Sequence, residues 1–147
     1  MSLEEIKQFA WKFIDEIFNK GNVKDVNRFV TPEFIYHARG EDIEGLGKFK
    51  EWISSDVGVF SDIQYTSVDS IAENNKVSAA WIVKGTHDKE YSGIPATHKQ
   101  FETVGISIFH FKGSKINELW TVADALSPAL ELGAVRPAFG EQNKTMG

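Results

Sequence analysis

Apolar residues recur at two different spacings along this chain of 147 residues, helical near its start and alternating further on. The helical spacing predicts a first helix that begins at Ser2, where Ser2 and Glu5 form a capping box, and ends at Gly21. Its apolar stripe consists of Ile6, Phe9, Phe13, Ile17 and Phe18. The same reasoning predicts helices over 23–30 and 46–53, a short strand over 34–37 and a polar loop over 39–45.

From about Ser61 the period changes to alternation, which is typical of strands with one buried face. Asn74-Asn75 and Gly113-Ser114 are turn signals, so neighbouring strands are expected to pair as antiparallel hairpins. Ser127-Pro128 predicts a last short helix, which Gly133 is placed to end. The predicted strands span residues 63–71, 77–87, 100–111 and 116–124, with a loop or irregular edge over 92–99.

Helices that precede a run of strands predict an α+β fold, with helices on one face of an antiparallel sheet. We expect the curved sheet to wrap on the N-terminal helices into a cone with an internal cavity, the natural place for a binding site. The chain length fits one domain. We predict a domain over residues 1–133 and a tail over 134–147 that is mobile or bound to a partner.

Composition excludes several functions. Aromatic residues make up 12% of the chain, which fits a lined cavity and a dense core equally well. A net charge of −5 with scattered lysines argues against nucleic acid, and no apolar run reaches the roughly 18 residues that cross a membrane. The absence of cysteine excludes disulfides and favours a reduced, cytoplasmic compartment, and acids in the first twenty residues argue against a secretory signal.

Asp124 is the main candidate for chemistry. Because strand side chains alternate, it shares a face with Trp120 and Val122, and burial there would raise its pKa above about 3.9 and suit it to acid–base work. Alternatively, Asp124 faces solvent or supports the helix that follows, and the pattern leaves both interpretations open. With a three-residue hairpin loop, Glu102 would lie opposite Asp124, and with a two-residue loop this pair is lost. His110 lies on the Glu102 face of its strand, roughly 20 Å from Asp124 at about 3.3 Å per residue.

Other candidates carry weaker signals. Substrate-binding candidates are His37 at the cavity mouth, His98 in its loop, and Trp81, Glu102 and Trp120 on the strands, although a packed or solvated role is favoured for each histidine. His87 is interpreted as part of a solvated turn. No metal-ligand spacing, glycine-rich phosphate loop or nucleophile elbow is present, so we expect no metal and no cofactor. Of the kinds of chemistry considered, proton transfer on a bound organic molecule is the one that these residues still allow.

Three segments resemble the SnoaL-like polyketide cyclases, also called ester cyclases: Gly93-Ile94-Pro95-Ala96-Thr97, then Gly105-Ile106 through Gly113, and Lys115 to Trp120. The similarity continues through Asp124 to Leu130-Glu131-Leu132-Gly133. It implies the cone-shaped α+β barrel shared with ketosteroid isomerase and scytalone dehydratase. The resemblance also implies aldol ring closure without metal or cofactor, Asp124 as acid/base, and a role for His110. Family members commonly have Gly at the position of His98, and often Arg at His110 and Gln at Glu131.

Three functions are expected, in this order. The first is a cofactor-free enzyme that performs an aldol condensation or a related proton abstraction on a hydrophobic, carbonyl-containing small molecule. The second is a small-molecule-binding domain without turnover. The third is a dimerisation domain that uses the convex face of the sheet, and we expect a homodimer or a higher homo-oligomer.

Overall fold

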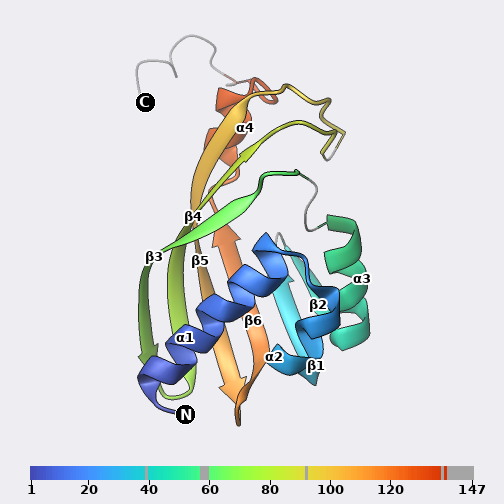
Figure 1. Cartoon of the computed structure of the whole chain (residues 1–147). Helices are drawn as coiled ribbons and strands as arrows, with labels where there is room; N and C mark the ends of the chain where they lie inside the picture. Colours follow the sequence, from blue (N-terminus) through green and yellow to red (C-terminus); the bar gives the residue numbers. More distant parts are fainter. Residues whose placement is uncertain (39, 57–59, 92, 137, 139–147) are drawn as a thin grey trace.

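The computed structural model describes residues 1–38, 40–56, 60–91, 93–136 and 138. It confirms the predicted α+β class, with a curved, unclosed sheet and helices from the N-terminal part of the chain (Figure 1). The helical elements are α1 (Leu3–Phe13), η1 (Ile14–Asn19), η2 (Val23–Asp25), α2 (Val26–Phe29), α3 (Leu46–Asp56) and α4 (Leu126–Glu131). The strands are β1 (Val30–Ala38), β2 (Glu41–Glu44), β3 (Gln64–Glu73), β4 (Lys76–Thr86), β5 (Gln100–Lys112) and β6 (Lys115–Ala123).

Helix α1 begins with the predicted capping box. The Ser2 hydroxyl accepts a hydrogen bond from the Glu5 amide, and the Glu5 carboxylate accepts one from the Ser2 amide, both at 3.1 Å. These bonds satisfy two amides that a helix start leaves without partners. The helix continues into the wider π-helical turn η1, and the chain turns away at Gly21, whose φ of +66° suits glycine.

The sheet has the strand order β2-β1-β6-β5-β4-β3. Four of its five pairings are antiparallel, but β1 runs parallel to β6, so the prediction of an antiparallel sheet was incomplete. β1 also begins at Val30, which was predicted to be helical, and β2 occupies part of the predicted 39–45 loop. The two differences have separate causes. Strand β2 is a short polar edge strand that pairs with neighbouring β1, Ala38 opposite Glu41, and no apolar alternation marks it. Strand β1 is stabilised by pairing with β6, more than eighty residues away, and short-range spacing does not show such a partner.

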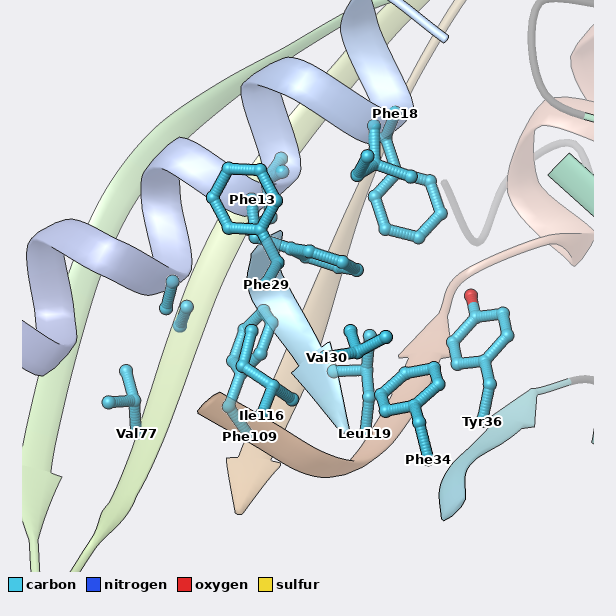
Figure 2. Close-up of a cluster of buried hydrophobic side chains, with 14 of the residues drawn as sticks. Phe13, Phe18, Phe29, Val30, Phe34, Tyr36, Val77, Phe109, Ile116 and Leu119 are labelled. Atoms are coloured by element: carbon cyan, nitrogen blue, oxygen red, sulfur yellow. The ribbon is translucent and has the colours of Figure 1, made fainter. Parts of the chain in front are cut away.

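Helices α1 and α3 cover one face of the sheet, here called the inner face (Figure 1). On β4 and β5 the odd-numbered residues point to this face and are mostly buried, whereas the even-numbered residues form the outer face. Phe13 of α1 lies at the centre of the core, with ring centroids 5.7–6.3 Å from four other phenylalanines (Figure 2). Much of the aromatic excess is therefore used to fill the core rather than to line a large cavity.

The tail predicted for residues 134–147 lies mostly outside the described residues. Within the part of the chain that is described, no helix combines the length and apolar character needed to cross a membrane.

Candidate functional site

The inner face contains a small cavity with a volume of about 20 Å³. A single water needs about 10–15 Å³ measured in this way, so the cavity accommodates one water-sized group. Elements η1, β1, β3, β4, β5 and β6 all contribute to its walls, which places it at the centre of the fold. Its lining residues are Ile14, Phe18, Tyr36, Tyr65, Trp81, Ser107 and Thr121.

A chain of hydrogen bonds crosses the cavity wall from Trp81 to Thr121. The Trp81 indole Nε1–H donates to Ser107 Oγ at 3.0 Å, and Ser107 Oγ lies 2.9 Å from Thr121 Oγ1. Trp81 and Ser107 are both almost fully buried. These polar groups are therefore satisfied inside an apolar wall, which holds the indole in one orientation.

Gly105 leaves space for the Trp81 ring on the inner face. The two residues are directly opposite in the β4–β5 pairing, and a Cβ added to Gly105 would lie only 2.3 Å from Trp81 Cη2. Glycine is therefore required here because the ring occupies the volume that any side chain would use. Trp81 is the one predicted site residue that lines the cavity.

The residues that line the cavity and are described by the structure carry no carboxylate, imidazole or amine. Its polar groups are the hydroxyls of tyrosine, serine and threonine and the indole N–H, which donate or accept hydrogen bonds. Such a wall can hold a carbonyl or hydroxyl oxygen, but it has no side chain that would accept a proton readily at pH 7. Sequence reasoning missed Tyr36, Tyr65, Ser107 and Thr121. For Ser107, a usable signal was a small polar residue at an odd position between Gly105 and Phe109.

Asp124 is not in this cavity. It follows β6 and is exposed, and its Oδ1 accepts a hydrogen bond from the Ser127 amide at 3.0 Å. Hydrogen bonding by the Ser127 side chain and backbone holds the pKa of Asp124 below its ordinary value. The expectations of burial and of a raised pKa were therefore wrong, and the alternative, a carboxylate that supports the start of α4, is confirmed. The catalytic role of Asp124 stays a prediction.

A bulge in β6 explains the error. Phe111 pairs with Ile116 but His110 pairs with Glu118, so Asn117 is an extra residue that breaks the alternation. Ile116 and Leu119 both point into the core as a result, and the residues predicted to face inward lie on the outer face. Trp120 is 46% exposed and Val122 is 75% exposed.

The same pairing separates Glu102 from Asp124. The hairpin has a two-residue turn, with Lys112 opposite Lys115, and the Asp124 amide donates to the Val104 carbonyl at 3.1 Å. Glu102 lies instead across from Lys84, whose Nζ is 3.5 Å from Glu102 Oε1. The prediction of two facing carboxylates was wrong, because it required a three-residue loop.

His37 and His110 come together on the outer face with Glu118. His37 Nε2 lies 2.6 Å from Glu118 Oε2 and its Nδ1 lies 2.5 Å from Asp42 Oδ1, while His110 Nδ1 lies 3.3 Å from Glu118 Oε1. The His37 ring also stacks on Trp120 with 3.8 Å between centroids. Four strands, β1, β2, β5 and β6, supply this outer-face cluster, defined as His37, Asp42, His110, Glu118 and Trp120. His37 therefore does not line the mouth of the cavity.

The two carboxylates favour the charged form of His37. Burial alone lowers the pKa of His37, but hydrogen bonds to Asp42 and Glu118 outweigh burial and hold the pKa above its ordinary 6.5. When the pKa of a histidine is higher in the folded than in the unfolded protein, its charged form stabilises the fold at pH values below the unfolded-state pKa. This stabilisation is lost as the pH rises through the folded-state pKa. Protonated His37 therefore links the carboxylates of Asp42 and Glu118 and holds together the strands that carry them.

The raised pKa of His37 predicts how the stability of the protein depends on pH. The free energy of unfolding of the wild type is expected to fall as the pH rises above 6.5, and His37→Gln is expected to remove that part of the slope. Urea denaturation at a series of pH values measures both. His98→Gln is the matched control, because His98 is exposed and forms no carboxylate contact among the described residues. A wild-type slope that His37→Gln leaves unchanged would contradict the role of His37.

His98 and His87 lie together on the loop that follows β4. His98 is exposed with φ +59°, does not line the cavity, and its amide donates to the His87 carbonyl at 2.8 Å. His87 itself is 3% exposed, with Nδ1 2.9 Å from Thr97 Oγ1 and its ring against Phe60. The interpretation of His87 as part of a solvated turn was wrong, because the loop folds back and covers it.

Metal ligation has no support in the described part of the chain, where no group of three or more His, Asp or Glu side chains is arranged to hold an ion.

A curved sheet with helices on its inner face and a small aromatic-walled cavity between them defines the class of α+β cone domains. The family model of the SnoaL-like polyketide cyclases matches residues 8–132. The chain belongs to this family, which confirms the resemblance noted in the sequence. No curated protein sequence matches the chain.

Solved structures agree on the fold. A protein from Acidithiobacillus ferrooxidans, provisionally named a polyketide cyclase, is similar with a TM-score of 0.81 at 24% identity, over 91% of this chain and 99% of that chain. TsrD from Streptomyces laurentii is similar with a TM-score of 0.79 at 22% identity, over 92% of this chain and 99% of that chain. AclR from Streptomyces galilaeus, provisionally named a hydroxylase, is similar with a TM-score of 0.78 at 18% identity, over 91% of this chain and 99% of that chain. Identities this low establish the fold alone.

Proposed function

We propose that this protein binds a hydrophobic small molecule and holds one of its carbonyl or hydroxyl oxygens in the inner cavity. The observation that carries the proposal is the Trp81–Ser107–Thr121 hydrogen-bond chain in an otherwise apolar, aromatic wall. The cavity takes one oxygen-sized group, so the body of the ligand lies outside it. Membership of the SnoaL-like polyketide cyclase family favours a ligand of polyketide type.

The hydrogen-bond chain provides a donor for such an oxygen. Trp81 has one N–H, and Ser107 Oγ accepts it. When the Ser107 hydroxyl donates in turn to Thr121 Oγ1, the Thr121 hydroxyl is left to donate to the ligand oxygen. A neutral ligand suits this wall better than an anion, because none of the described lining residues is a cation that would compensate for the desolvation of a charge.

A hydroxyl substitution tests the binding proposal. Thr121→Val removes the donor at nearly constant volume and is expected to weaken binding of a hydroxyanthraquinone probe roughly fivefold, the equivalent of about 1 kcal/mol for one hydrogen bond. Quenching of tryptophan fluorescence measures the dissociation constant. Thr121→Ser keeps the hydroxyl and is expected to bind within about twofold of the wild type. Equal binding by wild type and Thr121→Val would reject the proposal.

A cyclase-type reaction is the second candidate function. It is favoured by membership of the family, with Asp124 as the candidate acid/base. In that reaction Asp124 would remove a proton from the carbon next to a carbonyl of the substrate, and the enolate carbon would form a bond to a second carbonyl carbon of the same molecule. The protonated Asp124 would then return the proton to the alkoxide that this bond leaves. The lowered pKa of Asp124 keeps it ionised, so it would act first as a base.

A further inference from the structure

The N-terminal helical segment widens in its last turn, where it contacts the edge of the sheet. Element η1 is π-helical, and the Lys20 amide donates to the Asp15 carbonyl, five residues back, at 3.0 Å. In an uninterrupted α-helix Asn19 would lie about 140° around the axis from the buried Ile14, on the side away from the sheet. The extra residue of a π turn rotates Asn19 back toward β3, which η1 contacts.

The Asn19 side chain bonds to the backbone of Tyr65 through both of its polar atoms. Asn19 Nδ2 donates to the Tyr65 carbonyl at 3.1 Å, and the Tyr65 amide donates to Asn19 Oδ1 at 2.7 Å. Tyr65 lies on β3, which is the last strand on its side of the described sheet. The carboxamide therefore takes the place of a peptide group in a neighbouring strand, with one donor and one acceptor.

Asp15 fixes the orientation of this carboxamide. Asn19 Nδ2 also donates to Asp15 Oδ1 at 3.1 Å. This hydrogen bond outweighs burial and, together with Lys20, holds the pKa of Asp15 below its ordinary value. The ionised carboxylate only accepts hydrogen bonds, so the nitrogen of the carboxamide must face Asp15 and the oxygen is left to face the Tyr65 amide.

The residue that Asn19 holds is part of the wall of the inner cavity. The Tyr65 ring packs edge-on against Trp81, with 4.9 Å between centroids, and lies 5.7 Å from the ring of Phe18. Phe18 directly precedes Asn19 on η1 and also lines the cavity. One turn of the chain thus carries Phe18 into the wall and fixes Tyr65 beside it.

We propose that Asn19 is the positioning residue of the inner cavity. Its carboxamide fixes the backbone of Tyr65, so that the Tyr65 ring supports Trp81 in the orientation from which the indole donates to Ser107. Without this clamp the Tyr65 ring samples other positions, and only the fraction of molecules with an ordered wall binds a ligand well. The consequence for ligand binding rests on the proposed function, whereas the consequence for Tyr65 does not.

The first test follows Tyr65 directly and needs no ligand. The chain contains three tyrosines, so protein labelled with fluorotyrosine is expected to give three fluorine NMR resonances, and Tyr65→Phe identifies the one that belongs to Tyr65. Asn19→Asp keeps the size of the side chain but removes the donor to the Tyr65 carbonyl. This variant is expected to shift or broaden the Tyr65 resonance and to leave that of Tyr91, which packs against Phe60, unchanged.

Asn19→Ala is the second variant, because Asn19→Asp also places a second carboxylate beside Asp15. Alanine removes both bonds to Tyr65 without adding a charge, and it is expected to change the Tyr65 resonance in the same way. Asn19→Ala decides the test if Asn19→Asp does not fold. A Tyr65 resonance that stays at its wild-type position and width when Asn19 is replaced overturns the proposal.

Asn22→Asp is the matched control. Asn22 Nδ2 donates to Glu16 Oε2 at 2.6 Å, so the same substitution brings two carboxylates together close to η1. Among the described residues, Asn22 forms no hydrogen bond with a residue that lines the cavity. Asn22→Asp is therefore expected to lower the urea midpoint while the Tyr65 resonance stays as in the wild type. An equal change of this resonance in Asn22→Asp and Asn19→Asp would show general loosening and overturn the proposal.

The second test measures binding of the hydroxyanthraquinone probe. Asn19→Asp and Asn19→Ala are each expected to raise its dissociation constant roughly fivefold, whereas Asn22→Asp should stay within about twofold of the wild type. Wild-type affinity in both Asn19 variants overturns the positioning role. A wild type that does not bind the probe rejects the proposed function instead, and the Tyr65 resonance then decides by itself whether Asn19 positions Tyr65.

Discussion

Replacing Gly105 with alanine is expected to destabilise the protein by about 1–3 kcal/mol and to abolish binding in the inner cavity. The added Cβ would lie 2.3 Å from Trp81 Cη2, well inside contact distance, so the indole must move. Trp81 is 5% exposed and hydrogen-bonded to Ser107, and its displacement breaks that bond and changes the shape of the cavity wall. Urea denaturation measures the first effect and quenching by the anthraquinone probe measures the second.

Gly47→Ala is the matched control for this experiment. Gly47 lies in helix α3, has no heavy atom within 4 Å of an added Cβ, and has no positive φ. Alanine favours a helix over glycine by about 0.8–1 kcal/mol, so this variant is expected to be as stable as the wild type or more stable. If Gly105→Ala proved as stable as Gly47→Ala and bound the probe normally, the packing of Trp81 against Gly105 would not be what shapes the cavity.

For the catalytic candidate, Asp124→Asn is expected to reduce turnover of a cyclisable substrate roughly 10²–10⁴-fold, the usual contribution of a positioned acid or base. Binding should stay within about twofold of the wild type, because Asp124 does not line the cavity. The asparagine oxygen can still accept from the Ser127 amide, so the start of α4 is preserved. Product formation followed by mass spectrometry, beside probe binding, separates the two effects.

Glu131→Gln is the control for Asp124→Asn, because Glu131 is an exposed acid on α4 whose neutralisation is not expected to affect the reaction. Unchanged turnover in Asp124→Asn would reject the catalytic role of Asp124 and leave the binding proposal standing. An absence of turnover in the wild type, together with intact binding, would instead reject the catalytic candidate.

The sequence predicted the elements of this fold well where local interactions decide them. The capping box at Ser2 and the turn at Gly113-Ser114 depend on residues within a few positions of one another, and both were correctly read. The family was also readable, because its motifs keep their order along the chain. The parallel β1–β6 pairing could not be predicted from the sequence, because it joins segments more than eighty residues apart.

The candidate site was predicted less well, and one residue accounts for most of the difference. Alternation along β6 places Asp124 and Trp120 on the inner face only if the strand is unbroken, and the extra residue at Asn117 breaks it. A bulge is a property of a strand and its partner together, so no pattern within β6 reveals it. His37 and Glu118 likewise meet only because β1 and β6 are neighbours in the sheet.

By itself, then, the order of residues predicted a mainly helical first part, a strand-rich second part, the capping box and hairpin turns, and the family to which the chain belongs. The tertiary structure decided which face each side chain of β6 points to, and therefore that a neutral cavity lies on one face while the ionisable residues gather on the other. The physical reason is range: helices, caps and turns are set by neighbours along the chain, whereas strand register and facing depend on partners that only folding brings together.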